Sequence, residues 1–242
     1  MEEQSSKKLI TYLNYKDIII ILGFWFFMAA IILIAKNLEL KHLLLTSIFH
    51  FLFILCGRFF FLAIIIFYLT SLYPVNFKQM GIKLTPLREQ IIYGFSKVLL
   101  LLTATLFIIN IRLSFKENIV FTPLYEIKGP EYFMAALPPF LLVLSGAVFI
   151  ALSEQFILNS IIYELFKNTL FNKLLSTILS ALFYSVLIIS FTPSRILMNF
   201  IAALISLLLY QRKNSLFPPT LFMAGYYTIM IFFVYGWRFM NF

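Results

Sequence analysis

The chain has 242 residues, of which 62% are hydrophobic and 12% are charged, and its formal net charge at pH 7 is +9. Soluble domains are nearer to half apolar and a quarter charged, so this chain has too few polar side chains to cover a water-facing surface. The composition excludes a free soluble enzyme, a disulfide-stapled secreted protein and a disordered regulator. It indicates an integral membrane protein.

Seven apolar runs approach the length of about 20 residues that an α-helix needs to cross the hydrocarbon core. The fourth continues helically towards Phe166, and the sixth is short, so we expect six to eight spans. No window alternates polar and apolar residues as a barrel strand would. The pattern predicts an all-α fold, a polytopic bundle of about seven transmembrane helices. In chain order the runs are Ile18–Ala35, Phe49–Tyr73, Ile91–Ile111, Met134–Leu152, Leu174–Phe191, Ile196–Tyr210 and Leu216–Tyr235.

The distribution of basic residues predicts how the chain is oriented. Residues 1–17 contain Lys7, Lys8 and Lys16 and precede an apolar run that is too long for a typical cleaved signal peptide. Because Lys and Arg accumulate in cytoplasmic loops, we expect a cytoplasmic N-terminus and an uncleaved signal anchor. The low glycine content and the abundance of Lys, Ile, Phe and Asn suggest a bacterial cytoplasmic membrane. We expect residues 1–242 to form one integral membrane domain.

The basic balance and the scarcity of metal-binding side chains also limit the partners. In a membrane protein, excess Lys and Arg indicate attraction to anionic lipid, so we expect the lipid bilayer as a partner and no nucleic acid. The chain has one cysteine, Cys56, and two histidines, His42 and His50, both in its first quarter. We therefore expect no disulfide, no metal site and no cofactor.

Several polar residues fall at membrane depth, where each needs a reason because polar groups in lipid are costly. Arg58 has apolar residues on both sides; it either pairs within the bundle or contacts a lipid headgroup or substrate. Glu154 follows an uninterrupted apolar run and is a candidate general base. Gln155 and Asn159 are four residues apart and share one helix face, which suits hydrogen bonds between helices.

The region Glu154–Tyr227 resembles the CPBP family of intramembrane proteases, the CAAX protease and bacteriocin-processing (Abi) family. Gly81–Arg88 resembles the linker before one of the family's membrane helices, and Glu154–Ile162 resembles its Glu-Glu-x-x-Phe-Arg run. Leu182-Phe183 lies where the Phe-x-x-x-His helix begins. Arg212–Pro219 resembles the basic turn before the last motif helix. We expect residues 134–235 to form the CPBP-like core.

The resemblance implies a chemistry that this chain has largely lost. In the family, the first Glu activates a water molecule while histidines and an Asn assist and stabilise the oxyanion. Glu154 matches that first Glu and is the catalytic candidate. Leu and Met can neither bind a metal nor transfer a proton as imidazole does. The family positions that hold other residues here are Gln155, Asn159, Leu187, Met223 and Tyr227.

These departures favour a pseudoprotease, a non-catalytic scaffold or binding partner for a membrane protein, peptide or lipoprotein in a bacterial cell envelope. One alternative is a membrane hydrolase or acyl-transfer component that retains Glu154 as base, with Tyr184, Tyr226, Tyr227 or Asn159 as donors. A bacteriocin self-immunity protein is a further alternative. A transporter or channel is disfavoured because inverted repeats are not visible. Candidate binding residues are Arg58, Tyr184 and Tyr226.

Overall fold

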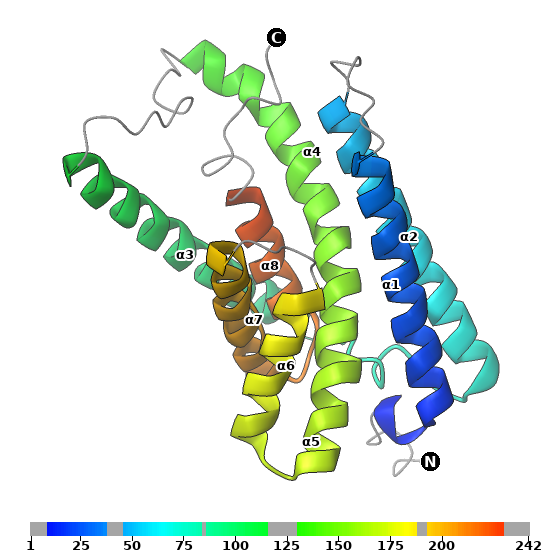
Figure 1. The fold of residues 1–242 in the computed structure, drawn as a ribbon. Coiled ribbons are helices and arrows are strands. Elements are labelled where there is room, and N and C mark those ends of the chain that lie inside the picture. Colours follow the sequence, from blue (N-terminus) through cyan, green and yellow to red (C-terminus); the bar gives the residue numbers. More distant parts are fainter. Residues whose placement is uncertain (1–8, 38–45, 84–85, 116–129, 188–192, 230–242) are drawn as a thin grey trace.

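The computed structural model describes residues 9–37, 46–83, 86–115, 130–187 and 193–229. These residues form helices and no strand, as Figure 1 shows. Within the described residues, eight α-helices, a short 3₁₀ turn and a π-helix follow one another in sequence. Their bounds are η2 Leu9–Thr11, α1 Tyr15–Asn37, α2 Thr46–Leu72, α3 Leu87–Phe115, α4 Pro130–Gln155, η3 Phe156–Tyr163, α5 Glu164–Leu170, α6 Lys173–Leu187, α7 Pro193–Lys213 and α8 Phe217–Ile229.

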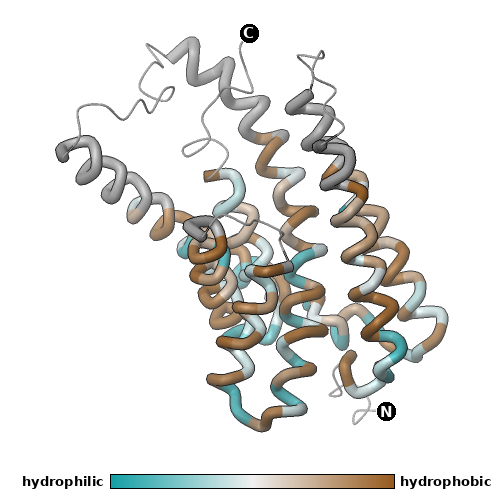
Figure 2. Tube along the Cα trace, viewed as in Figure 1, coloured by the Kyte–Doolittle hydropathy of each residue, from teal (hydrophilic) through white to brown (hydrophobic). Residues whose placement is uncertain are grey.

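The all-helical membrane bundle predicted from the sequence is confirmed. Three helices of the described residues are long and apolar enough to cross a membrane, namely Ile54–Leu72, Val143–Leu170 and Ile196–Lys213. The apolar helix Lys173–Val186 is shorter. The number of spans, expected as six to eight, stays a prediction. Figure 2 shows that hydrophobic residues run along the helices, while hydrophilic residues gather towards the end of the bundle where the first described residues lie.

The continuous helical segment formed by α4, η3 and α5 occupies the centre of the bundle. It contacts α2 on one side and α6, α7 and α8 on the other, while α3 packs against α8. The sequence predicts that this helix runs towards Phe166, and the backbone is helical to Leu170. However, residues Phe156–Tyr163 form a π-helix, and all eight are buried. π-helical turns are rare, and they frequently lie at functional sites.

The sixth predicted span is longer in the structure than its apolar run. Pro193 begins α7, where its fixed φ angle and missing N–H fit the first turn. Arg212 and Lys213 lie in the last turn, where positive charge interacts favourably with the helix dipole. Asn214 then ends the helix with φ of 48°. The apolar run alone, Ile196–Tyr210, misses these polar ends.

The start of α1 is fixed by a reciprocal capping arrangement. The Asn14 backbone N–H donates to Asp17 Oδ2 at 2.9 Å, and the Asp17 N–H donates to Asn14 Oδ1 at 3.0 Å. The hydroxyls of Tyr68 and Tyr73 donate to the two oxygens of the same carboxylate at 2.7 and 2.5 Å. Asp17 therefore ties the start of α1 to the end of α2, a helix pair that packs together along its length.

The turn after α2 docks onto the π-helix and onto the start of α8. Ser160 Oγ donates to the Met80 carbonyl at 2.8 Å, and the Leu216 N–H donates to the Gly81 carbonyl at 2.9 Å. Gly81 has φ of 88°, and an added Cβ would lie 3.1 Å from Leu216 Cγ. A glycine is required here because any larger residue would be strained and crowded. The turn thereby anchors η3 from the end opposite Glu154.

Candidate functional site

Glu154 lies at the meeting point of several helices. It is 4% exposed and belongs to the last turn of α4, directly before the π-helix. The hydroxyl of Tyr184 on α6 donates to Glu154 Oε2 at 2.7 Å, and the hydroxyl of Tyr227 on α8 donates to the same oxygen. The two phenol oxygens are 3.0 Å apart. Elements far apart in the sequence thus converge on one carboxylate.

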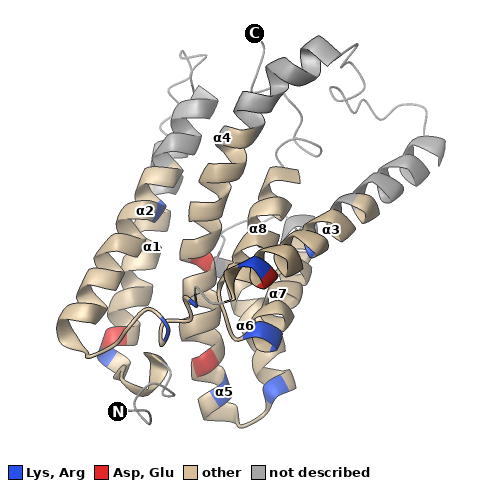
Figure 3. Ribbon diagram, turned by 180° about the vertical axis from the view of Figure 1, so that it is seen from behind, with Lys and Arg blue, Asp and Glu red and all other residues tan. Residues whose placement is uncertain are grey.

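The other carboxylate oxygen faces a cation. Arg58 Nη2 on α2 lies 3.7 Å from Glu154 Oε1, and both side chains are buried. The guanidinium carbon of Arg58 lies 3.6 Å from the ring centroid of Trp25 on α1, a cation–π contact. We call Glu154, Arg58, Tyr184 and Tyr227 the carboxylate cluster. Figure 3 shows how sparse the charged residues are along the described helices, so a charge pair inside the bundle stands out.

The predicted polar face of Gln155 and Asn159 is present and is used. Asn159 Nδ2 donates to Gln155 Oε1 at 2.7 Å, and Ser206 on α7 donates to the same Gln155 oxygen. Both amide side chains are fully buried. These bonds join the π-helix to α7, as expected for polar side chains that hold membrane helices together. Among the described residues, the hydrogen bonds of Gln155 and Asn159 join these side chains to each other and to Ser206 and do not include Glu154.

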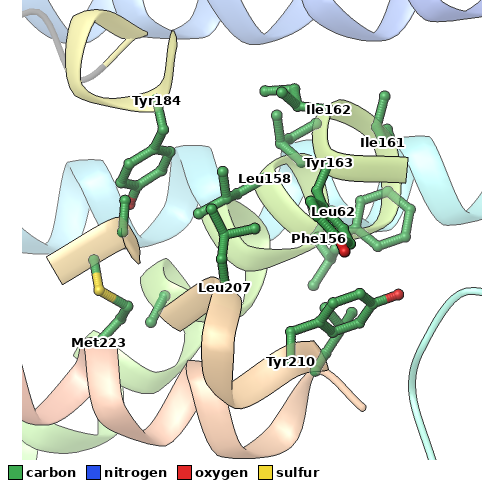
Figure 4. Packing of buried hydrophobic residues seen from close by; sticks show 14 of the residues in the cluster. Leu62, Phe156, Leu158, Ile161, Ile162, Tyr163, Tyr184, Leu207, Tyr210 and Met223 are labelled. Atoms are coloured by element: carbon green, nitrogen blue, oxygen red, sulfur yellow. The ribbon is translucent and has the colours of Figure 1, made fainter. Parts of the chain in front are cut away.

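Of the remaining family positions, the structure describes the side chain of Met223 but not that of Leu187. Met223 on α8 is fully buried in apolar packing, and Figure 4 shows it near Tyr184 and Leu207. Leu187 is the last residue of α6, and its side chain lies outside the described residues. Tyr226 donates a hydrogen bond to Asn199 on α7 at 3.3 Å, whereas Tyr227 donates to Glu154 on α4.

The sequence reasoning missed a further buried carboxylate, on the same helical segment as Glu154. Glu164 begins α5, is 2% exposed and lies 3.8 Å from Lys167 Nζ. Glu164 follows Glu154 by ten residues on the same helical segment. An inspection of that segment for acidic residues after Glu154 could have found it from the sequence. Lys167 is partly exposed, so the pair lies towards a hydrated end of the segment. Glu164 belongs to a helix end rather than to the carboxylate cluster.

The chemical capacity of the carboxylate cluster follows from these contacts. Glu154 accepts hydrogen bonds, both tyrosines donate them, and Arg58 supplies a positive charge. Within the described residues no group of three or more His, Cys, Asp or Glu side chains could hold a metal ion. His42 lies outside the described residues, as does the side chain of His50. The cluster can hold or move a proton, or bind a polar group.

Comparison with known proteins identifies one family. The family model described as "Type II CAAX prenyl endopeptidase Rce1-like" matches residues 136–229. This confirms the resemblance to the CPBP family that the sequence motifs indicate. The matched segment contains most of α4 and all of η3, α5, α6, α7 and α8, and so includes Glu154, Tyr184 and Tyr227. Searches of curated proteins and of solved structures found no match.

Proposed function

We propose that this chain, whose residues 136–229 match the Rce1-like family model, is a non-catalytic member of the CPBP family. In this proposal it holds a membrane protein, peptide or lipoprotein without cleaving it. The observation that carries the proposal is that the Glu154 carboxylate already accepts hydrogen bonds from Tyr184 and Tyr227 and pairs with Arg58. We further propose a bacterial cytoplasmic membrane as its location, with the N-terminus on the cytoplasmic side.

The contacts of Glu154 argue against its use as a base. A general base must lie within hydrogen-bond reach of the proton that it removes, directly or through one water molecule. Here Oε2 already accepts two phenol hydrogen bonds and Oε1 faces a guanidinium. A water molecule at Oε2 would have to displace one of the tyrosines, and a water molecule at Oε1 would lie beside the positive guanidinium of Arg58. The arrangement instead supports a role in joining α2, α4, α6 and α8.

The residues at the other family positions support the same proposal. Met223 is buried and apolar, and Gln155 and Asn159 are engaged with each other and with Ser206. None of these can replace a histidine in proton transfer. Loss of a single oxyanion donor in an enzyme costs about 100- to 1,000-fold in rate. The altered positions are together less charged and more apolar than the family pattern, which suits retention of an acyl chain or helix.

One observation favours a second candidate function. Two phenol hydroxyls lie beside the only family carboxylate that this chain retains, so hydroxyl donors and a carboxylate are together in a buried site. A membrane hydrolase or acyl-transfer enzyme would use Glu154 as the base and a tyrosine hydroxyl as the donor to the developing oxyanion. This alternative requires that a water molecule reach Glu154, either at Oε1 beside Arg58 or at Oε2 in place of a tyrosine.

The experiment that separates the two candidates uses purified protein in vesicles that contain prenylated CAAX-type peptides or lipopeptides. We expect wild-type protein and the Glu154→Gln variant to retain the same amount of peptide, with the peptide mass unchanged. Glutamine is preferred to alanine because its carbonyl oxygen still accepts hydrogen bonds from the neighbouring donors. Glu89→Gln, at an exposed acidic residue on α3, is the matched control for the loss of one charge.

The proposal is overturned by a shorter peptide that forms with wild-type protein and with Glu89→Gln but not with Glu154→Gln. A peptide that none of the three proteins retains above protein-free vesicles also counts against it, because the proposal requires binding. Mass spectrometry of the recovered peptide measures both outcomes in one sample.

A further inference from the structure

Three basic side chains surround the ring of Tyr93, near the start of α3 and the end of α7. The ammonium nitrogens of Lys97 and Lys213 each lie 5.4 Å from the Tyr93 ring centroid, within the range of a cation–π contact. Arg212 Nη1 donates to the Tyr93 hydroxyl at 3.3 Å. Two helices that are distant in sequence therefore hold three positive charges around one ring. We call Tyr93, Lys97, Arg212 and Lys213 the Tyr93 basic cluster.

The cluster carries more positive charge than its described contacts neutralise. Glu89 Oε2 lies 3.9 Å from Lys213 Nζ, and the Glu89 side chain is largely exposed. Among the described residues, neither Lys97 nor Arg212 has an acidic partner within ion-pair distance. Like charges that are held close together repel each other, and an anion placed among them relieves this repulsion. The cluster is therefore suited to bind a negatively charged group.

The cluster lies at the membrane surface rather than in the hydrocarbon core. Arg212 and Lys213 end the segment Ile196–Lys213, which is long and apolar enough to cross a membrane. Tyrosine is enriched at the level of the lipid headgroups, where its ring is in apolar and its hydroxyl in polar surroundings. Lys97 lies one turn beyond Tyr93 on α3, and a lysine at this depth extends its ammonium group towards the interface. These residues are at the depth of lipid headgroups.

The cluster belongs to the end of the bundle at which α1 begins. The contacts of Asp17 with Tyr68 and Tyr73 mark that end of α1 and α2. The turn after α2 bonds to the start of α8, where the Leu216 N–H donates to the Gly81 carbonyl at 2.9 Å. Since α7 ends only three residues before Leu216, the basic cluster lies at this same end. We expect this side to be cytoplasmic, and anionic lipids give the cytoplasmic leaflet a negative surface potential.

Exposed apolar side chains lie one helical turn deeper than the cluster. Leu208 precedes Arg212 by four residues and is 55% exposed, and Leu100 follows Lys97 by three residues and is 65% exposed. Residues at these spacings share a helix face. A lipid can contact the basic groups with its headgroup and the leucines with its acyl chains, whereas a water-soluble anion can contact only the basic groups.

We propose that the Tyr93 basic cluster binds the phosphate group of an anionic phospholipid from the surrounding leaflet. The guanidinium of Arg212 and the two ammonium groups supply donors and positive charge for the phosphate oxygens. This inference does not depend on the role of Glu154, because no residue of the carboxylate cluster takes part in it.

The test compares two phospholipids with the same acyl chains. Purified full-length protein is equilibrated in vesicles that contain equal amounts of phosphatidylglycerol and phosphatidylcholine, and the lipids retained after extraction in mild detergent are quantified by mass spectrometry. Both lipids carry a phosphate, but choline neutralises that of phosphatidylcholine. A basic residue near a membrane surface contributes about fivefold to the affinity for anionic lipid, so we expect at least about tenfold more phosphatidylglycerol than phosphatidylcholine.

A parallel sample separates a lipid from a soluble anion. It contains inorganic phosphate and is compared with a sodium chloride sample of equal ionic strength, so that both screen surface charges to the same extent. We expect the two samples to give the same lipid ratio, because the acyl chains add contacts that inorganic phosphate lacks.

Variants of the cluster assign the preference to its basic residues. A triple variant with Lys97→Gln, Arg212→Gln and Lys213→Gln should retain the two lipids in nearly equal amounts. Each single variant should lose part of the preference, by about fivefold or less. The single variants serve as the test if the triple variant does not fold, which circular dichroism and gel filtration establish beforehand.

A matched control removes the same charge elsewhere. Its three substitutions are at exposed lysines outside the cluster, namely Lys16→Gln, Lys78→Gln and Lys173→Gln. Because charges beyond a Debye length are largely screened, we expect the control to keep the wild-type lipid ratio to within about twofold.

The inference is overturned if the wild-type protein retains the two lipids equally, or if the triple variant of the cluster, or each single variant where the triple does not fold, keeps the wild-type ratio. It is also overturned if the control variant loses as much preference as the cluster variant, since net charge alone would then explain the effect. Loss of the preference in inorganic phosphate but not in sodium chloride would assign the cluster to a soluble anion instead.

Discussion

Two carboxylates in this protein each accept hydrogen bonds from two tyrosines, and the difference between them is instructive. Asp17 shares its bonds, one tyrosine to each oxygen, and also caps the start of α1 through Asn14. Glu154 receives both tyrosines on one oxygen and turns the other towards Arg58. The Asp17 contacts join neighbours in sequence and one helix pair, whereas those of Glu154 join four helices.

This difference shows at which of the two sites the stability of the fold depends on a buried charge pair. At Asp17 the carboxylate replaces backbone bonds that a helix end lacks, a local task that other capping residues perform. At Glu154 a buried negative charge is balanced by a buried positive one, so removal of either leaves the other uncompensated. A carboxylate with two tyrosine partners therefore caps a helix at Asp17 and joins the central helices of the bundle at Glu154.

The largest effect is expected from breaking the buried charge pair. Glu154→Ala should lower the free energy of unfolding by about 3–5 kcal/mol, because it leaves Arg58 buried without its counter-charge. Chemical denaturation in detergent, followed by circular dichroism, measures the change. Glu89→Ala removes an exposed partner of Lys213 and should change stability by less than about 1 kcal/mol. An Arg58→Met, Glu154→Ala double variant that is no more stable than Glu154→Ala would contradict this account.

A smaller effect is expected at the helix cap. Asp17→Ala removes the reciprocal cap with Asn14 and the acceptor of two tyrosine hydroxyls, and we expect a loss of about 2 kcal/mol. Asp17→Asn keeps an acceptor for the cap and should recover part of that loss. Equal destabilisation by alanine at Asp17 and at Glu154 would remove the distinction between the two sites.

Removal of one phenol hydroxyl tests how the bonds at Glu154 are shared. Tyr227→Phe should cost about 1–2 kcal/mol, because Tyr184 still donates to the same carboxylate oxygen. Tyr184→Phe should cost a similar amount, and the double variant should cost more than the sum because Glu154 then loses both donors. Strict additivity in a double-mutant cycle would show that the two tyrosines act independently.

The smallest effect concerns pH at the Asp17 contacts. The hydrogen bond to Asp17, together with burial and the nearby charge, raises the pKa of Tyr73 to about 12 from an ordinary value of 10.0. The protonated phenol is therefore favoured in the folded state. Its contribution to stability is complete below about pH 10 and is lost as the pH rises through 12.

The pKa of Asp17 is shifted in the opposite direction, so its effect on stability appears at acidic pH. Burial acts to raise the pKa of Asp17, but hydrogen bonds from Tyr73, Tyr68 and the backbone outweigh it and lower the pKa below 3.8. Stability from Asp17 is thus present above pH 3.8 and is lost as the pH falls through the lowered value. The alkaline step of unfolding measured against pH should be smaller in Tyr73→Phe than in the wild type and unchanged in Tyr15→Phe, at an exposed tyrosine. An alkaline step of undiminished size in Tyr73→Phe would contradict the assignment.

The sequence predicts the helices well, because helices depend on local patterns. Apolar runs of helical length mark the bundle, and the spacing of Gln155 and Asn159 places them on one face. The pairing of Arg58 with Glu154 is a contact between distant helices, which periodicity does not encode. The π-helix also escapes prediction, because an apolar, buried segment such as Phe156–Tyr163 reads equally well as an ordinary α-helix.

The most direct test of the central claim, that Glu154 is held by the protein rather than used for catalysis, is a single-turnover incubation. Protein in excess is mixed with a prenylated CAAX-type peptide in vesicles, and the fraction of peptide cleaved is measured over time by mass spectrometry. We predict the same fraction for wild-type protein, Glu154→Gln and protein-free vesicles. Cleavage by the wild-type protein that falls by about 100-fold or more in Glu154→Gln would contradict the account.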